Sequence, residues 1–240
     1  MAAPVIAAVI PVLDEELAIA DVVAAVRAHV AHVVVVDGNS KDRTAERART
    51  AGADVVVESR RGYGRAIRAG IGTLGQSADI ILFIDGDGSD CADRIPEMLA
   101  PLLSREADFV HGTRMQGERE PGSLALPQIV AGHLAGSLIR LLYGFRYTDM
   151  SPFRAIRRDT LERLGMRDET FGWNLEMQMR VAASGLRIVE IPVGQRRRRG
   201  GVSKVSGSPL VALRVVWVLG GTFLRLAATL RRERMASQRS

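Results

Sequence analysis

The chain is poor in cysteine, in aromatic residues and in long hydrophobic runs. One cysteine among 240 residues, Cys91, excludes a disulfide framework and a thiolate metal site, and it fits a reducing compartment. The longest apolar runs reach about half of the ~20 residues that a membrane-spanning helix needs. The N-terminus turns acidic at Asp14 without a basic stretch, so we expect neither a signal peptide nor a transmembrane segment. With 47% hydrophobic and 25% charged residues, the composition predicts one globular domain rather than disorder.

Positive charge is concentrated at the end of the chain. Residues 196–240 carry eleven Lys and Arg residues against one acid, Glu233, so this segment has a charge of +10 and the rest of the chain −4. No aromatic residues lie among the arginines of 196–199, which argues against a nucleic-acid partner. Acidic lipid headgroups or substrate phosphates are better partners for this segment.

Short β-branched runs alternate with longer stretches rich in Ala and Arg. Four such alternations within the first 105 residues, with almost continuously apolar strands, predict an α/β fold with a parallel sheet. Strands are expected over 5–11, 33–36, 53–58, 79–85, 107–111 and 187–192, and helices over 14–29, 92–103, 125–143 and 173–184. The segment PFRAIRR (152–158) receives no assignment from its pattern.

Polar clusters follow three of these strands. They are Asp14–Glu15 after the first strand, Asp37–Ser40 after the second and Asp85–Asp87 after the fourth. In parallel α/β sheets, ligands bind beyond the carboxyl ends of the strands. The clusters are therefore expected to converge on one edge, which is the first indication of a functional site.

The common nucleotide-binding motifs are absent. The first strand leads into PVLDEE instead of a glycine-rich turn, RGYGRAIRAG (61–70) does not match the dinucleotide fingerprint, and no phosphate-loop sequence occurs. These absences argue against a nicotinamide oxidoreductase and a phosphate-loop enzyme.

The sequence IDGDGSD (84–90) places two carboxylates, Asp85 and Asp87, on a turn after a buried strand, where both can reach one hard cation. An EF-hand loop is excluded, because its sixth position would be Asp90 and its twelfth Pro96. The alternative is a simple turn that uses Asp and Gly for its geometry.

Eight segments, and the order in which they follow one another along the chain, resemble family 2 inverting glycosyltransferases. The resemblance is greatest to the polyprenyl-phosphate (dolichyl-phosphate) mannosyl- and glucosyltransferases. The segments are VIPVLDEE, VVVDGNSKDRT, GYGRAIRAGI, FIDGDGSD, FVHGTR, DMSPFRAI, FGWNLEMQMR and RRGGVSK. The resemblance implies a GT-A domain over 1–208, with a mostly parallel sheet flanked by helices, followed by a basic amphipathic helix and tail over 209–240.

The same resemblance implies roles for individual residues. Asp85 and Asp87 would hold Mg²⁺ or Mn²⁺, with Asp87 on the metal that bridges the donor diphosphate. Asp37 would lie by the base, although it could also only cap a helix. The residues expected at the nucleotide sugar are Pro11, Leu13, Glu15, Asp37, Asp85 and Gly86. Those expected at the phosphates and the acceptor are Arg114, Arg198, Arg199, Ser203 and Lys204.

Two features leave the acceptor chemistry open. Members of this group usually carry a further Arg and Ser before the middle helix, where residues 124–136 offer Gln128 and no arginine. Glu176 is a candidate catalytic base, but Glu176 and Arg180 stand at i and i+4 and could form only an ion pair.

The C-terminal segment has the pattern of an amphipathic helix. Arg214, Arg225 and Arg232 fall within about 20° of one another around a helix, and the other faces are mainly apolar. Such a helix can lie in an anionic membrane interface. The alternative is a helix packed on the core or on a second subunit of a homo-oligomer.

Together these features predict a metal-dependent inverting glycosyltransferase, peripheral at the cytoplasmic face of the membrane. It would move a hexose from a nucleotide sugar of the GDP-mannose or UDP-glucose type to a polyprenyl phosphate. The alternatives are a small soluble hydroxyl acceptor with the same donor chemistry, and a regulatory domain that binds a nucleotide sugar without turnover.

Overall fold

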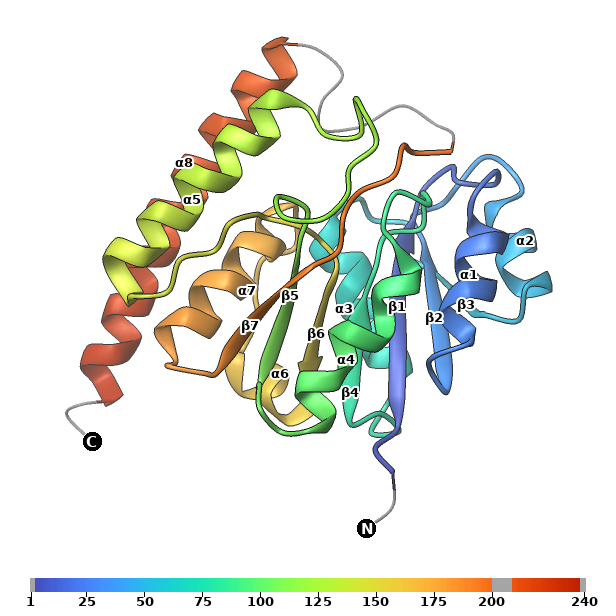
Figure 1. Cartoon of the computed structure of the whole chain (residues 1–240), viewed down its shortest axis with the longest axis horizontal. Helices are drawn as coiled ribbons and strands as arrows, with labels where there is room; N and C mark the ends of the chain where they lie inside the picture. Colours follow the sequence, from blue (N-terminus) through green and yellow to red (C-terminus); the bar gives the residue numbers. More distant parts are fainter. Residues whose placement is uncertain (1–2, 200–208, 238–240) are drawn as a thin grey trace.

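Seven strands form one sheet in the order β3-β2-β1-β4-β6-β5-β7 (Figure 1). The computed structural model describes residues 3–199 and 209–237. For residues 209–219 and Ser237 it describes the backbone alone. The strands are β1 Ile6–Val12, β2 His32–Asp37, β3 Asp54–Val57, β4 Ile80–Phe83, β5 Phe109–Thr113, β6 Arg154–Arg157 and β7 Ile188–Pro192. The helices are α1 Ile19–Arg27, α2 Thr44–Thr50, α3 Tyr63–Thr73, a 3₁₀ turn η1 Ala92–Arg94, α4 Ile95–Leu103, α5 Leu126–Tyr143, α6 Arg158–Leu164, α7 Gly172–Ala183 and α8 Pro209–Ser237.

Helices cover both faces of the sheet, as its apolar strands require. On one face, residues of α1, α2 and α4 pack on one side of the strands, including Ile10, Val35 and Leu82. On the other face, residues of α3, α6, α7 and α8 pack against Val9, Val36 and other strand residues. The predicted α/β class, the six predicted strands and the mostly parallel pairing are confirmed.

One strand was not predicted. β6 lies within the unassigned PFRAIRR segment and runs antiparallel to both of its neighbours, β4 and β5. Its two apolar residues, Ala155 and Ile156, stand between arginines, so no alternating pattern marks it in the sequence. Arg154 is fully buried there, and its Nη1 donates a hydrogen bond to the Asn174 carbonyl oxygen at 3.1 Å.

The predicted C-terminal helix is present as α8, and its described side chains pack on α7. Phe223, Leu226 and Leu230 are buried in the core that also contains the α7 side chains. Arg180 of α7 donates to Glu233 of α8 at 3.0 Å. In residues 220–236 these three side chains therefore face the protein core, as in the alternative to a membrane-facing helix, while Leu224 is exposed. Among the described residues, no helix is long and apolar enough to cross a bilayer.

Candidate active site

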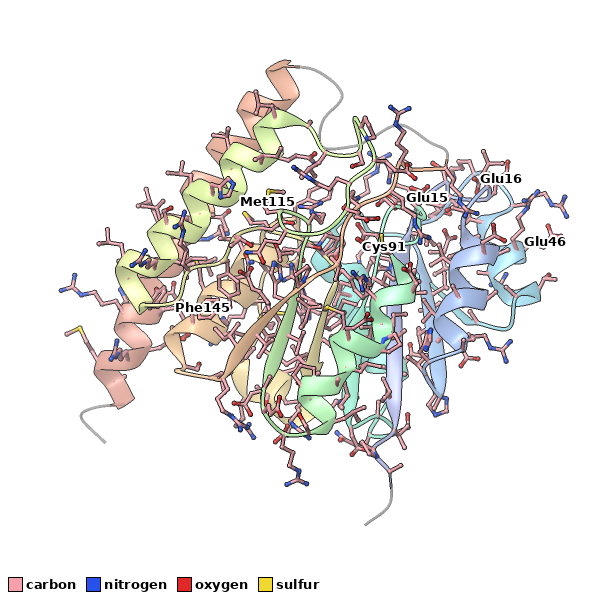
Figure 2. All side chains as sticks on the ribbon, viewed as in Figure 1. Glu15, Glu16, Glu46, Cys91, Met115 and Phe145 are labelled. Carbon is pink, nitrogen blue, oxygen red and sulfur yellow. The ribbon has the colours of Figure 1, made fainter. Side chains whose placement is uncertain are left out.

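The loops after β1 and β2 are tied together at the carboxyl edge of the sheet. The Asp14 backbone N–H donates to Ser40 Oγ at 2.9 Å, and the Lys41 N–H returns a bond to Asp14 Oδ1 at 2.8 Å. The Glu15 N–H donates to Thr44 Oγ1 at 2.8 Å, which holds Glu15 at this edge (Figure 2). The convergence expected from the sequence is thus made by specific loop-to-loop hydrogen bonds.

The residues predicted for the nucleoside line the same edge. Asp37 is almost fully buried at the end of β2, and its Oδ1 accepts a hydrogen bond from the Ser40 backbone N–H at 3.2 Å. Pro11 pairs with Val36 inside the sheet, and Leu13 follows β1, beside Gly38. Asp37 therefore holds its own turn, and this structural role is compatible with a contact to a base.

The acidic turn after β4 passes close to β1, and Gly86 permits this. A Cβ at Gly86 would lie 2.3 Å from Val12 Cγ1, so a side chain at this position would push the turn away from the sheet. The Asp85 N–H donates to Asp90 Oδ2 at 3.0 Å, and the Ser89 N–H donates to Asp87 Oδ1 at 2.8 Å. Asp90, which the sequence analysis did not single out, therefore joins the pair of carboxylates.

Negative charge accumulates in this turn. Asp85 Oδ1 is buried and has no hydrogen-bond partner among the described residues. Burial, followed by the charges of Asp90 and Asp87, raises the pKa of Asp85 well above its usual value. Burial also raises the pKa of Asp90 to about 7. Crowded carboxyl groups of this kind are stabilised when a cation binds between them.

A basic segment after β7 lies over the acidic turn. The Arg196 N–H donates to the Ser89 carbonyl oxygen at 2.8 Å, and the Arg199 N–H donates to that of Asp87 at 3.2 Å. Arg198 Nε donates to Asp87 Oδ2 at 2.9 Å, and its Nη2 donates to Glu15 Oε1 at 3.0 Å. Arg198, which was expected at the donor phosphates, therefore connects the basic segment to the acidic turn and to Glu15.

Arg199, the other arginine predicted for the basic loop, is placed differently. The Arg199 side chain pairs with Asp21 of α1 instead of the acidic turn. Ser203 and Lys204 lie outside the described residues.

The acidic turn fits a hard divalent cation held partly by substrate. Carboxylate oxygens are the protein ligands that Mg²⁺ and Mn²⁺ prefer, and Mg²⁺ is commonly bound by one or two carboxylates together with substrate phosphates. No group of three or more acidic, His or Cys residues in the part of the chain that the structure describes forms a complete cation cage. Asp85 and Asp87 would therefore supply the protein ligands, and the remaining positions would be open to phosphate oxygens and water.

Arg114, predicted to meet the acceptor phosphate, is engaged with a carboxylate. It follows β5, is nine-tenths buried, and donates to Asp149 through Nε at 2.6 Å and Nη2 at 2.8 Å. Burial opposes ionisation of Asp149, but the hydrogen bonds and charge of Arg114 lower its pKa to about 2. Asp149 stands in the DMSPF segment, 35 residues away in the sequence, which gave no sign of this pair.

Glu176, the candidate base, lies in the interior. Its Oε2 accepts hydrogen bonds from the backbone N–H groups of Arg167 (3.0 Å) and Asp168 (2.6 Å), and its Oε1 accepts one from Arg180 Nε at 2.8 Å. The residue is only 1% exposed. One oxygen thus holds the loop before α7 and the other pairs with Arg180 within α7, and this geometry favours the ion-pair interpretation over a catalytic base.

Glu176→Gln is accordingly expected to lower stability more than activity. Losing hydrogen bonds to a charged group typically costs about 1.5–3 kcal/mol, whereas losing a general base costs ~10²–10⁴-fold in rate. Chemical denaturation and kcat/KM measured on the same preparation separate the two. Glu46→Gln is the matched control, since Glu46 forms an exposed i,i+3 pair with Arg43 and such pairs contribute little. A rate collapse in a stable Glu176→Gln protein would instead restore the base.

Sequence comparison gives a family match and close relatives. The family profile described as Glycosyl transferase family 2 matches residues 7–165. A protein described as an uncharacterised glycosyltransferase of Mycobacterium tuberculosis is 40% identical over 210 residues, 87% of this chain and 93% of that protein. The undecaprenyl-phosphate mannosyltransferase of Micrococcus luteus is 33% identical over 190 residues, 73% of this chain and 76% of the relative.

Structural comparison finds the same fold in solved proteins. A crystal structure of glucosyl-3-phosphoglycerate synthase from Mycobacterium tuberculosis, in complex with Mn²⁺, UDP and glucosyl-3-phosphoglycerate, superimposes with a TM-score of 0.71. The match covers 94% of this chain and 80% of the other at 23% identity. This likeness establishes a shared fold.

Proposed function

The chain belongs to glycosyl transferase family 2, with the GT-A fold and the use of a nucleotide sugar typical of that family, and from this premise we propose that it transfers a hexose to a polyprenyl phosphate with inversion. The proposal places the enzyme at the cytoplasmic face of the membrane as a peripheral protein, where a nucleotide sugar and a polyprenyl phosphate would meet.

The acidic turn at the sheet edge carries the donor side of this proposal. Asp85 and Asp87 would hold Mg²⁺ or Mn²⁺, which supplies charge stabilisation for the diphosphate leaving group when bound. Asp37, Pro11 and Leu13 would border the nucleoside. Arg198 already contacts Asp87 and Glu15, so its guanidinium lies where a donor phosphate would need a positive partner.

The acceptor side rests on the chemistry of phosphate and on the Micrococcus relative. A hydroxyl acceptor must lose a proton as it attacks, whereas a phosphate monoester already carries an anionic oxygen at pH 7, because its second pKa is about 6. A phosphate acceptor therefore needs no general base, in agreement with the structural use of both Glu176 oxygens. The 33% identity to an undecaprenyl-phosphate mannosyltransferase supports the same acceptor class.

Two observations favour the alternative of a small soluble hydroxyl acceptor. Gln128, the polar residue in the segment that lacks the usual arginine, is used within the helix start: its Oε1 accepts a hydrogen bond from the Ala125 N–H at 3.0 Å. Arg114 is likewise paired with Asp149. Both acceptor classes are therefore compared in one experiment.

We expect the purified protein to convert labelled GDP-mannose or UDP-glucose, with undecaprenyl phosphate, into a product that partitions into organic solvent. Excess chelator should abolish this transfer, and added Mg²⁺ or Mn²⁺ should restore it, because the diphosphate would lose its charge stabilisation. Parallel reactions contain 3-phosphoglycerate or glycerol as soluble acceptors. Label transferred only to these would overturn the lipid acceptor, and donor binding without release of nucleoside diphosphate would indicate a non-catalytic domain.

A further inference from the structure

Helix α5 exposes a mainly apolar face, with Ser137 between its leucines. Leu126, Val130, Leu134 and Leu141 are 71%, 57%, 55% and 80% exposed. At about 100° per residue, these four side chains fall within an arc of about 80°. Exposed leucines scattered singly are ordinary, but four large apolar side chains gathered on one helix face mark a contact surface.

The opposite face of α5 is fixed against the protein. Gly132, Gly136 and Ile139 are the buried residues of this helix. A Cβ at Gly136 would lie 1.9 Å from the Tyr147 carbonyl oxygen, so the helix rests directly on the backbone of the segment that follows it. The orientation of α5 is therefore set by close packing, and this packing turns the leucines outward.

Positive charge lies at the C-terminal end of this apolar stripe. Residues 126–143 contain no acidic residue, and Arg140 and Arg146 are exposed at the C-terminal end of the helix. Helices α5 and α8 both pack against α7, on the same side of the sheet (Figure 1). The described part of α8 adds Arg231, Arg232 and Arg234, all exposed, while its acid Glu233 pairs with Arg180.

We propose that the exposed face of α5, formed by Leu126, Val130, Leu134 and Leu141, docks on the surface of an anionic phospholipid bilayer. Apolar side chains on one face with arginines beside them are typical of helices that lie in the membrane interface. A second copy of the chain fits less well, because a symmetric contact places the same patch on both subunits and would bring equal arginines together.

This surface deepens the proposed function without depending on it. α5 begins twelve residues after Arg114 and ends six residues before Asp149, the partner of Arg114. Short chain segments therefore connect both ends of the helix to this buried ion pair. Docking through α5 would place the candidate acceptor side at the lipid surface, where a polyprenyl phosphate resides. Vesicle binding is measured without donor or acceptor and is therefore independent of the reaction.

The test is sedimentation of the purified protein with vesicles of phosphatidylcholine, with and without phosphatidylglycerol. The wild type should bind the anionic vesicles, and added salt should weaken binding. Leu134→Glu/Leu141→Glu should bind about tenfold more weakly, because charge replaces the apolar face. Val57→Glu/Leu103→Glu, at exposed apolar positions of β3 and α4 (54% and 46% exposed), adds the same two charges away from α5, so it is the matched control and should bind normally. Thermal unfolding confirms that each variant is folded.

Three results overturn the inference. They are absence of wild-type binding, equal binding by the α5 variant, and a wild-type dimer in light scattering that the α5 variant dissociates. The α5 variant is also assayed with undecaprenyl phosphate dispersed in detergent. If the α5 variant transfers sugar normally in detergent but no longer binds vesicles, the docking role is supported. If the wild type binds vesicles through α5 but transfers no sugar to polyprenyl phosphate, only the proposed function is rejected.

Discussion

Asp87→Asn is expected to lower sugar transfer by about 10²–10³-fold, a loss typical of removing one group that stabilises developing charge. Asp87 is 8% exposed in the middle of the acidic turn and contacts Arg198. An amide in its place has no charge to offer a divalent cation. The free energy of unfolding should not fall along with the activity. The substitution removes one negative charge from beside Asp85 and Asp90, whose pKa values are already raised.

Mn²⁺ binding by the protein with a nucleoside diphosphate provides a second readout beside kcat/KM. Asp93→Asn is the matched control, since Asp93 lies near the same turn, is exposed and pairs with Arg196. We expect the control to retain both Mn²⁺ binding and activity. An Asp87→Asn protein with unchanged Mn²⁺ affinity would remove Asp87 from the proposed metal site.

Arg114→Met is expected to destabilise the protein by about 3–5 kcal/mol, the usual cost of leaving one partner of a buried ion pair uncompensated. Asp149 is 1% exposed and accepts two hydrogen bonds from the Arg114 guanidinium. Without Arg114, Asp149 must remain charged in a buried place or take up a proton. At about 2–4 °C per kcal/mol, the melting temperature should fall by roughly 10 °C.

A double-mutant cycle distinguishes this effect from simple loss of packing. Adding Asp149→Asn to Arg114→Met removes the uncompensated charge, so the double variant should be more stable than Arg114→Met alone. Activity measured well below the melting temperature then reports whether Arg114 also contacts the acceptor. An Arg114→Met protein that melts with the wild type would contradict the buried pair.

Local sequence patterns predicted much of the framework. The Val33–Val36 run, flanked by polar residues, predicted a buried strand, and β2 contains it. Parallel strands end at a common edge, so Asp37, Asp85 and Asp87 could be assigned to one site before any contact was known. Spacing along one short turn was enough for Asp85 and Asp87, because both residues come from the same loop.

Burial and long-range partners were decided by the tertiary structure. β6 has only two apolar residues, and it is a strand because β4 and β5 lie on either side of it. The spacing of Glu176 and Arg180 fits a surface ion pair as well as a buried one. This pair is buried because α8 packs over α7 and because the loop that contains Arg167 and Asp168 covers Glu176.

Long-range contacts also decided the partner of Arg114 and the exposed face of α5. Nothing in the chain near Arg114 indicates that Asp149, 35 residues away, will hold it. α5 is apolar on several faces, so periodicity alone does not distinguish the buried face from the exposed one. The sequence by itself determined the class of fold and the edge that carries the acidic turn, because those depend on neighbours in the chain. Contact between distant segments decided which charges are paired and which leucines face outward, because burial depends on neighbours in space.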